Sequence, residues 1–116
     1  MSSSLAVDRV GKSKTSLGVL LSRRKIPFVL CGVYIVRRAE TILYVGSTRY
    51  GPRERLRWHW HERKSQLGQL MRRSDDWREW IVEWVPLKPY SDAAQYEREL
   101  IVALRPELNG KGGGMR

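Results

Sequence analysis

The sequence predicts a small α/β (α+β) domain in which a three-stranded, mainly antiparallel sheet is flanked by helices. Two neighbouring segments of strand composition, joined by a short turn, predict a β-hairpin within residues 28–45. A helical period follows the hairpin, and a further strand pattern and helical period follow later in the chain. With 116 residues, the chain is long enough for one domain with one modest core. We place this domain at residues 27–110.

The hairpin is predicted from side-chain composition. β-Branched and apolar residues dominate residues 28–36 and 42–45, and such side chains pack well on a pleated surface. Arg38, Ala39 and Glu40 separate the two segments and are the expected turn.

The first helix is expected directly after the hairpin. Gly51 and Pro52 break the strand, and residues 53 to about 67 then carry apolar side chains at helical spacing. Leu56, Trp60 and Leu67 form this apolar stripe.

The last two elements are a strand and a helix. Residues 80–85 alternate in the strand period and end at Pro86, which cannot continue a sheet ladder. Asp92 is the expected N-cap of a helix that runs to about Leu104 and ends before Pro106.

Both ends of the chain differ in composition from the domain. Residues 1–26 are rich in Ser, Lys and Arg, and we expect a basic, partly disordered arm with a short helix at its apolar stretch, Leu17 to Leu21. Residues 111–116 are the expected flexible, Gly-rich tail.

The charge balance favours a polyanionic partner. Lys and Arg total 22 against 12 Asp and Glu, a net charge of +10, and binding to phosphates releases condensed counterions. Nucleic acid is the expected partner, with an anionic membrane surface or no polyanion at all as the weaker alternatives. The single cysteine, Cys31, excludes an intramolecular disulfide, and no stretch approaches the roughly 20 apolar residues of a membrane span. We therefore expect a cytoplasmic protein.

Glu97 is a carboxylate placed where a core residue is expected. On a helical wheel, Ala93, Leu100 and Leu104 form an apolar arc, and Glu97 falls within it. A carboxylate facing a core is costly unless it is paired or bound to a metal. An ion pair with one of the arginines and a metal site are both consistent with this position.

Two polar residues of the first helix are expected to converge on one point. Arg55 and His59 are four residues apart, so their side chains lie on the same helix face and together can bind a phosphate. The alternative for His59 is an ordinary exposed histidine.

One tyrosine lies on each strand of the hairpin. A register that pairs Tyr34 directly with Tyr44 places both hydroxyls on one face of the sheet. Packing without chemistry is the alternative for this pair.

A further set of cationic and aromatic residues is expected to contact the nucleic acid, with solvent-exposed charge as the alternative for the arginines. This set consists of Arg49, Arg53, Arg57, Trp58, Arg72 and Arg73.

These motifs together resemble the GIY-YIG nuclease family, in the form of a stand-alone domain. Gly32-Val33-Tyr34 and Tyr44-Val45-Gly46 resemble the paired signature that gives the family its name, with Val33 in place of isoleucine. Arg55 with His59, Glu97 with Leu100-Ile101, and the run from Arg105 to Asn109 resemble the family's later motifs in the same order. Arg53 and Arg57 are alternatives to Arg55 as the matching arginine. We prefer Arg55 because it lies four residues before His59.

The resemblance implies roles for these residues. Glu97 would bind one Mg²⁺ or Mn²⁺ per active site, and Asn109 would orient that site from the following loop. Tyr34 would help remove a proton from the attacking water, and Arg55 would bind the phosphate. Tyr44 and His59 would supply hydrogen bonds or a proton relay.

The leading hypothesis is thus a metal-dependent endonuclease that hydrolyses DNA phosphodiester bonds by a single-metal mechanism. The alternative is a non-catalytic nucleic-acid-binding module that retains the GIY-YIG fold. An RNA-binding accessory protein ranks last, because no single-strand platform motif supports it. Without an appended specificity domain, we expect weak specificity, a targeting partner protein or a homodimer.

Overall fold

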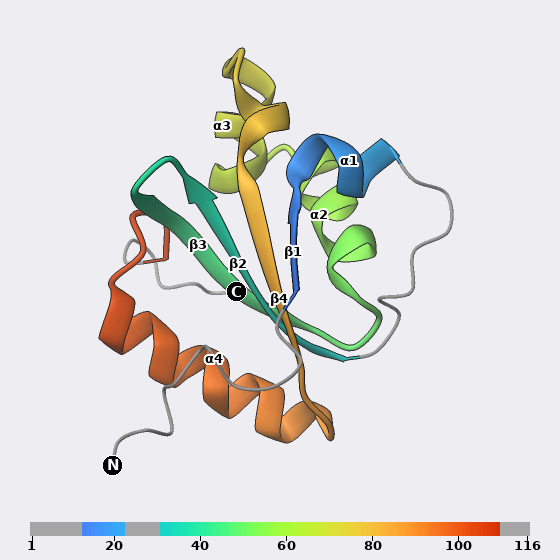
Figure 1. Cartoon of the computed structure of the whole chain (residues 1–116), viewed down its shortest axis with the longest axis vertical. Helices are drawn as coiled ribbons and strands as arrows, with labels where there is room; N and C mark the ends of the chain where they lie inside the picture. The colour runs from blue at the N-terminus through green and yellow to red at the C-terminus, as the bar shows by residue number, and fades with distance from the viewer. Residues whose placement is uncertain (1–12, 23–30, 110–116) are drawn as a thin grey trace.

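The core of the molecule is one four-stranded antiparallel sheet with the strand order β1-β4-β2-β3 (Figure 1). The computed structural model describes residues 13–22 and 31–109 of the chain. The strands are β1 (Ser13–Ser16), β2 (Gly32–Arg38), β3 (Thr41–Thr48) and β4 (Ile81–Pro86). The hairpin strand β3 therefore lies at one edge of the sheet.

Helices cover both faces of the sheet. The helices are α1 (Leu17–Ser22), α2 (Pro52–His61), α3 (Gln66–Arg73) and α4 (Tyr90–Leu104), with a short 3-10 turn, η2 (Trp77–Glu79). The longest helix, α4, lies alone beneath one side of the sheet, and the others gather on the opposite side (Figure 1). None of the described helices is long and apolar enough to cross a membrane.

Alternation along the strands divides the apolar side chains into two cores. Under α4, Val33, Ile35 and Val45 of the hairpin pack with Ala93 and Leu100 of the helix. On the other face, a larger core joins strands β2, β3 and β4 to the remaining helices. Its buried members are Leu17, Leu20, Tyr34, Val36, Leu43, Leu56, Leu67, Met71, Trp80, Val82 and Trp84.

The predicted fold class is confirmed, and the sheet has one strand more than expected. The additional strand, Ser13–Ser16, is polar and carries no strand signature, but it pairs with β4 along the free edge of that strand. The following helix buries Leu17 and Leu20 completely or nearly so. Residues 13–22 of the predicted arm thus pack onto the domain, whereas residues 1–12 and the tail at 111–116 lie outside the described residues.

The prediction of a single helix over residues 53–67 is wrong, because two helices occupy this region. Helix α2 ends at His61, and the extended backbone of Glu62 breaks it. Ser65 then caps α3 by accepting a hydrogen bond from the backbone N–H of Gly68 at 2.9 Å. Apolar residues recur at helical spacing on both sides of this break because both helices bury residues in the same core. Arg72 and Arg73 lie in the last turn of α3.

The hairpin does not have the register that would pair the two tyrosines directly, a register that the sequence left open. Tyr34 pairs with Gly46, and Tyr44 pairs with Val36, so the two tyrosines are diagonal neighbours rather than direct partners. An irregularity between Val36 and Arg37 shifts the ladder, which composition alone does not reveal. Both rings still lie on one face, with their centroids 6.1 Å apart.

The start of α4 differs slightly from the prediction. The helix begins at Tyr90 after Pro89, and Asp92 lies in its first turn without capping it. A carboxylate in the first turn still complements the helix dipole. The end is as expected, because Arg105 adopts a left-handed conformation with φ of 50° just before Pro106.

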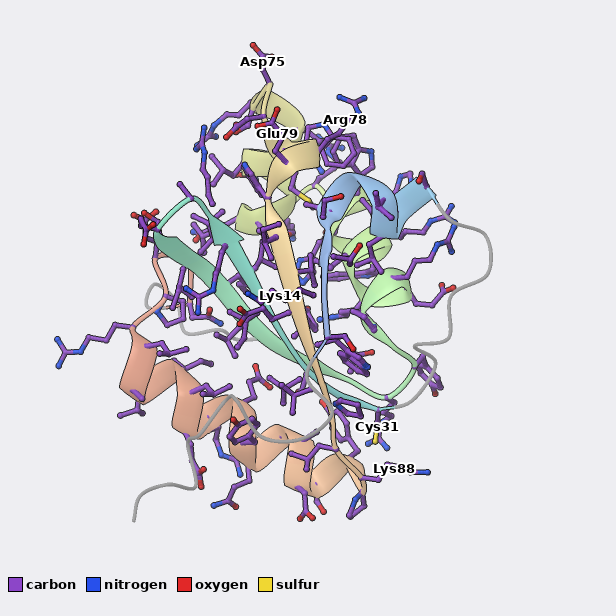
Figure 2. All side chains as sticks on the ribbon, viewed as in Figure 1. Lys14, Cys31, Asp75, Arg78, Glu79 and Lys88 are labelled. Carbon is purple, nitrogen blue, oxygen red and sulfur yellow. The ribbon has the colours of Figure 1, made fainter. Side chains whose placement is uncertain are left out.

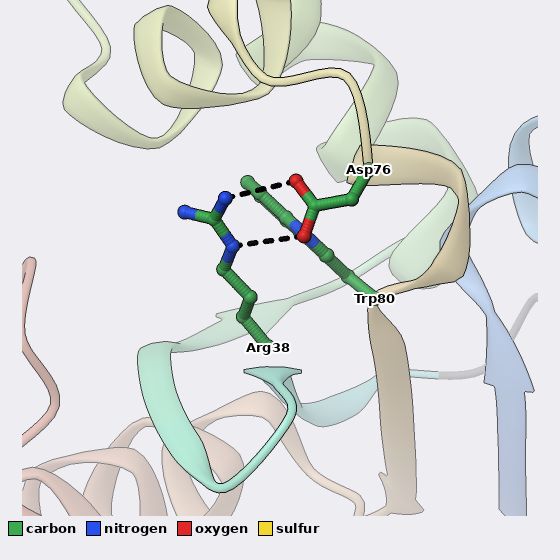
Figure 3. A network of polar contacts seen from close by, with 3 residues as sticks. All are labelled: Arg38, Asp76 and Trp80. Carbon is green, nitrogen blue, oxygen red and sulfur yellow. Dashed lines mark hydrogen bonds and ion pairs between the residues drawn. The ribbon is translucent and has the colours of Figure 1, made fainter.

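A polar contact network ties the hairpin turn to the segment that leads into β4 (Figure 3). Arg38 donates two hydrogen bonds of 2.9 Å to the carboxylate of Asp76, and the Trp80 indole donates a third at 3.1 Å. These donors, Arg38 first, lower the pKa of Asp76. Nearby Asp75, Arg78 and Glu79 project outward at the η2 end of the molecule, and Lys88 projects at the opposite end (Figure 2).

Candidate active site

A cavity of about 280 Å³ lies at edge strand β3, where residues from both faces of the sheet meet. Because no further strand lies beyond an edge strand, α2 and α4 can both present side chains there from opposite faces. The lining residues are Tyr34, Tyr44, Gly46, Ser47, Arg55, Tyr90, Glu97 and Asn109. Five of the six predicted catalytic residues belong to this lining, and the sixth, His59, lies directly behind it.

The side chain of Tyr34 extends from β2 across Gly46 of the neighbouring strand β3 to reach the cavity. Its partner in the ladder is Gly46, and a Cβ built on Gly46 would lie 2.5 Å from the phenol oxygen. The absence of a side chain at Gly46 therefore allows the completely buried Tyr34 ring to lie over β3, toward the edge.

Arg55 and His59 converge on the Tyr34 phenol, as their spacing on α2 predicted. The Arg55 cation acts on the Tyr34 phenol by lowering its pKa, and His59 Nε2 lies 3.3 Å from the phenol oxygen. His59 is only 4% exposed and packs edge-on against the Tyr44 ring, with centroids 5.1 Å apart. The exposed-histidine alternative is therefore wrong.

Burial determines the charge of both groups. It lowers the pKa of His59 from 6.5 to about 3, with a further contribution from the Arg55 cation, so the imidazole is neutral at neutral pH. Burial also raises the pKa of Tyr34 well above its ordinary value, as do Tyr44 and Glu97, whereas Arg55 acts in the opposite direction. Tyr34 is therefore a neutral phenol in this structure.

Glu97 enters the cavity from α4. It lies on the same side of the helix as buried Ala93 and Leu100 and is itself half-buried. The Ser47 hydroxyl donates to its Oε1 at 2.5 Å. Among the described residues, no arginine lies within ion-pair distance of Glu97, so the predicted ion-pair alternative is not found there.

Ser47 in turn contacts Tyr90, which lies two helical turns before Glu97. Their hydroxyl oxygens are 3.2 Å apart. Since Ser47 donates its only hydrogen to the carboxylate, Tyr90 must be the donor to Ser47. Sequence reasoning missed both residues, although the seven-residue spacing of Tyr90 and Glu97 places them on one helix face and was a usable signal.

Asn109 holds the strand that carries the site. Its side-chain oxygen accepts from the Val45 N–H at 2.8 Å, and its amide nitrogen donates to the Val45 carbonyl at 2.9 Å. The backbone N–H groups of Glu107 and Leu108 also donate to carbonyls of β3. The segment after α4 thus binds the free edge of β3 beside the cavity, and Asn109 is 4% exposed.

The residues that were predicted to contact nucleic acid differ in how exposed they are. Arg49 stacks on the Tyr90 ring at 4.3 Å, beside the cavity. Trp58 is 44% exposed, and the Arg55 guanidinium lies 4.1 Å from its ring centre. Arg53 differs, because its side chain is only 12% exposed. Of the remaining residues, Arg57, Arg72 and Arg73 are exposed.

Three side chains bring oxygen atoms together at the α4 side of the cavity. Among the described residues, no group of three or more His, Cys, Asp and Glu side chains forms a multidentate metal site. Glu97 supplies a carboxylate, with the Ser47 and Tyr90 hydroxyls beside it. This oxygen-only set fits a hard divalent cation such as Mg²⁺ or Mn²⁺, which commonly binds through one or two carboxylates and retains waters.

Comparison with known proteins agrees with this geometry. A family model described as the GIY-YIG catalytic domain matches residues 30–111. Two similar solved structures are point mutants of the GIY-YIG N-terminal endonuclease domain of UvrC from Thermotoga maritima, each with a tyrosine replaced by phenylalanine and bound to the catalytic divalent cation. They are 19% and 20% identical to this chain, each has a TM-score of 0.59, and each match covers 80% of this chain and 92% of the other. A comparison with curated protein sequences gives no significant match.

At this identity, the two structures show a shared fold, and the family model carries the assignment because it matches most of the chain. The chain therefore belongs to the GIY-YIG catalytic domain family, the family that its hairpin and helix motifs resemble.

Proposed function

We propose that this chain is an endonuclease that hydrolyses DNA phosphodiester bonds with one divalent metal ion, Mg²⁺ or Mn²⁺, bound by Glu97. One observation carries the proposal: Tyr34, Arg55 and Glu97, from three different elements, line a single cavity at the edge of β3. Membership of the GIY-YIG family and the divalent cation bound to the two UvrC domains support it.

Arg55 binds the scissile phosphate in this proposal. Its guanidinium lines the cavity and is held on one side by the Trp58 ring. A fixed cation aimed at a phosphate stabilises the charge that develops in the transition state more than it stabilises the ground state. Burial beside the cavity strengthens this effect, because the local dielectric is low.

Tyr34 accepts a proton from the attacking water. Its neutral phenol must first release its own proton to solvent water in the cavity, a step that the raised pKa opposes. Two neighbours favour the phenolate: Arg55, which lowers the pKa of Tyr34, and His59 when its Nε2 donates. Arg55 therefore has two functions, because it acts on both the base and the phosphate.

Glu97 holds the metal ion, and Ser47 orients the carboxylate through its 2.5 Å hydrogen bond. When bound, the cation supplies charge stabilisation on the scissile phosphate and the leaving oxygen. Tyr90 holds Ser47 in place and supports Arg49 on its ring, so one residue connects the metal ligand to a basic side chain at the edge of the cavity.

The substrate approaches a basic surface. The chain carries a net charge of +10, and Arg57, Arg72 and Arg73 are exposed on α2 and α3. These residues bind backbone phosphates, and Trp58 stacks on a base or sugar near Arg55. The contacts read the backbone rather than base edges, so sequence specificity is weak.

The test is cleavage of supercoiled plasmid by the purified protein with Mg²⁺, with Mn²⁺ and with EDTA. We expect relaxed circles to appear only with a divalent metal, and Glu97→Ala to abolish them. Glu99→Ala is the matched control, because Glu99 lies on the same helix and its contact is an exposed hydrogen bond to Gln95. DNA binding, measured by fluorescence anisotropy in EDTA, is expected to be unchanged in both variants.

Each other outcome has a definite meaning. Binding without cleavage by the wild type, at any metal concentration, identifies a non-catalytic GIY-YIG module. Cleavage that persists in Glu97→Ala removes Glu97 as the metal ligand. Direct conversion of supercoiled plasmid to linear product, without nicked circles, indicates two coupled active sites and hence a dimer.

A further inference from the structure

Ser65 lies behind the catalytic side chains, at the junction of α2 and α3. Its hydroxyl oxygen is 2.7 Å from Nδ1 of His59, whose other nitrogen contacts Tyr34. Ser65 is 9% exposed and His59 is 4% exposed, so these polar atoms are shielded from bulk water. The three residues form a continuous line from the cavity wall to the start of α3.

The hydrogen bonds of Ser65 identify the donor in this line. A serine hydroxyl has one hydrogen and two lone pairs. One lone pair already accepts the backbone N–H of Gly68 at 2.9 Å, which is the N-terminal cap of α3. If His59 Nδ1 also donated to this oxygen, the hydroxyl hydrogen would have no acceptor among the described residues. A buried donor without a partner is unfavourable, so Ser65 donates and Nδ1 accepts.

This direction determines the tautomer of His59. A neutral imidazole carries its proton on only one nitrogen, and Nδ1 is occupied as an acceptor. The proton therefore lies on Nε2, which donates to the Tyr34 oxygen across 3.3 Å. The Arg55 cation also acts on this phenol and favours its ionised form. The His59 N–H and the Arg55 cation thus both favour a phenolate.

We propose that Ser65 is a positioning residue that holds His59 in its Nε2–H tautomer, so that His59 donates to the Tyr34 oxygen on the side opposite Ser65. The opposite tautomer would make Tyr34 the donor to His59, and the phenol hydrogen would point away from the cavity. The catalytic consequence rests on the proposed nuclease function, whereas the tautomer itself does not.

Close packing of the two helices keeps Ser65 in this position. A Cβ built on Gly68 would lie 1.8 Å from the carbonyl oxygen of His59, so the first turn of α3 sits directly against the end of α2. Ser65 thus both caps α3 and contacts His59. Because its oxygen accepts the cap hydrogen bond, the hydroxyl hydrogen of Ser65 points to Nδ1.

The test uses three substitutions with distinct hydrogen-bonding properties. Ser65→Thr retains a hydroxyl that both caps and donates. Ser65→Asp retains a cap acceptor but is unable to donate when ionised, so it accepts from Nδ1 and inverts the tautomer. Ser65→Ala removes both functions. The Thr and Asp variants keep the helix cap, so loss of folding does not obscure the result.

The first readout is the ¹⁵N NMR spectrum of the imidazole nitrogens, which reports the tautomer without turnover. The chain has two histidines, and exposed His61 is the internal reference. We expect Nε2–H in the wild type and Ser65→Thr, and Nδ1–H in Ser65→Asp. The second readout is kcat, which we expect to fall in Ser65→Asp by about 10- to 100-fold, as for other outer-shell partners of functional histidines, with KM unchanged.

Two results would overturn the proposal: an Nδ1–H tautomer in the wild type, or an inverted tautomer in Ser65→Asp with unchanged kcat. If the wild-type protein cuts no DNA, the nuclease proposal fails, and the NMR spectrum still decides whether Ser65 holds the tautomer. The two failures are therefore distinguishable.

Discussion

Gly46 lies directly opposite Tyr34 in the β2–β3 ladder, and the Tyr34 ring fills the space that a side chain at position 46 would occupy. A Cβ there would lie 2.5 Å from both Cζ and the hydroxyl oxygen of the phenol. The glycine of one motif thus sets the position of the tyrosine of the other.

Gly46→Ala is expected to displace the Tyr34 ring. Because the ring is completely buried, we expect a loss of about 1–3 kcal/mol in the free energy of unfolding, as for other overpacked sites. A shift of the base by about 1 Å can lower kcat by about 100-fold. Urea denaturation and plasmid nicking measure the two effects. In a Tyr34→Ala background the stability loss should largely vanish, and an undiminished loss there would mean that the clash is elsewhere.

Asn109→Asp tests whether Asn109 acts on the strand or on the reaction. The variant keeps the acceptor for the Val45 N–H but loses the donor to the Val45 carbonyl, so an oxygen faces an oxygen. We expect the free energy of unfolding to fall by about 1–3 kcal/mol at neutral pH. A normal denaturation curve combined with altered Mn²⁺ affinity would instead assign Asn109 a direct role at the metal.

Ser47→Ala is expected to weaken metal binding without unfolding the protein. Removal of the hydroxyl frees the Glu97 carboxylate from its 2.5 Å contact, and we expect a loss of about 10- to 100-fold in Mn²⁺ affinity. Titration calorimetry with Mn²⁺ measures it. Tyr90→Phe should have a smaller effect, because its hydroxyl contacts Ser47 rather than the carboxylate. Equal effects of the two variants would contradict this order.

Stability should fall with decreasing pH because of His59. The folded pKa is about 3 and the unfolded value is about 6.5, so between these values the unfolded chain binds the additional proton. The contribution of neutral His59 is therefore fully present above pH 6.5 and is lost as the pH falls toward 3, at roughly 1 kcal/mol per pH unit. Denaturation curves of the wild type and His59→Gln should converge over this window. His61→Gln, at an exposed position, should follow the wild type.

Exposed arginines of α2 and α3 should contribute to DNA affinity through phosphates. Arg73→Ala is expected to weaken binding uniformly across sequences and to reduce the slope of log affinity against log salt by about 1. Lys88→Ala is the control, since it removes one charge at the end of the molecule opposite to α3 (Figures 1 and 2). Binding isotherms at several salt concentrations provide the slopes. Identical slopes for the two variants would show that α3 does not face the DNA.

Local patterns were sufficient to predict the hairpin, the last strand, the last helix and their order. Each of these elements carries its own signal, such as the alternation in residues 80–85 or the apolar arc that includes Glu97. The same locality holds for Arg55 and His59, whose four-residue spacing on one helix brings both to the Tyr34 phenol. Ordered short motifs then identified the family, which the family model over residues 30–111 confirms.

Contacts between segments far apart in the sequence determined the features of the fold and site that local patterns did not predict. Strand β1 is a polar segment that becomes a strand because β4 offers a free edge, and Asn109 binds Val45 across 64 residues. The hairpin register and the break before Ser65 depend on which side chains fit the shared core, a property of the packed molecule rather than of any window of sequence. For the same reason, the sequence named Glu97 and Tyr34 as candidates, but only the tertiary structure placed them, from opposite faces of the sheet, at one cavity on its edge.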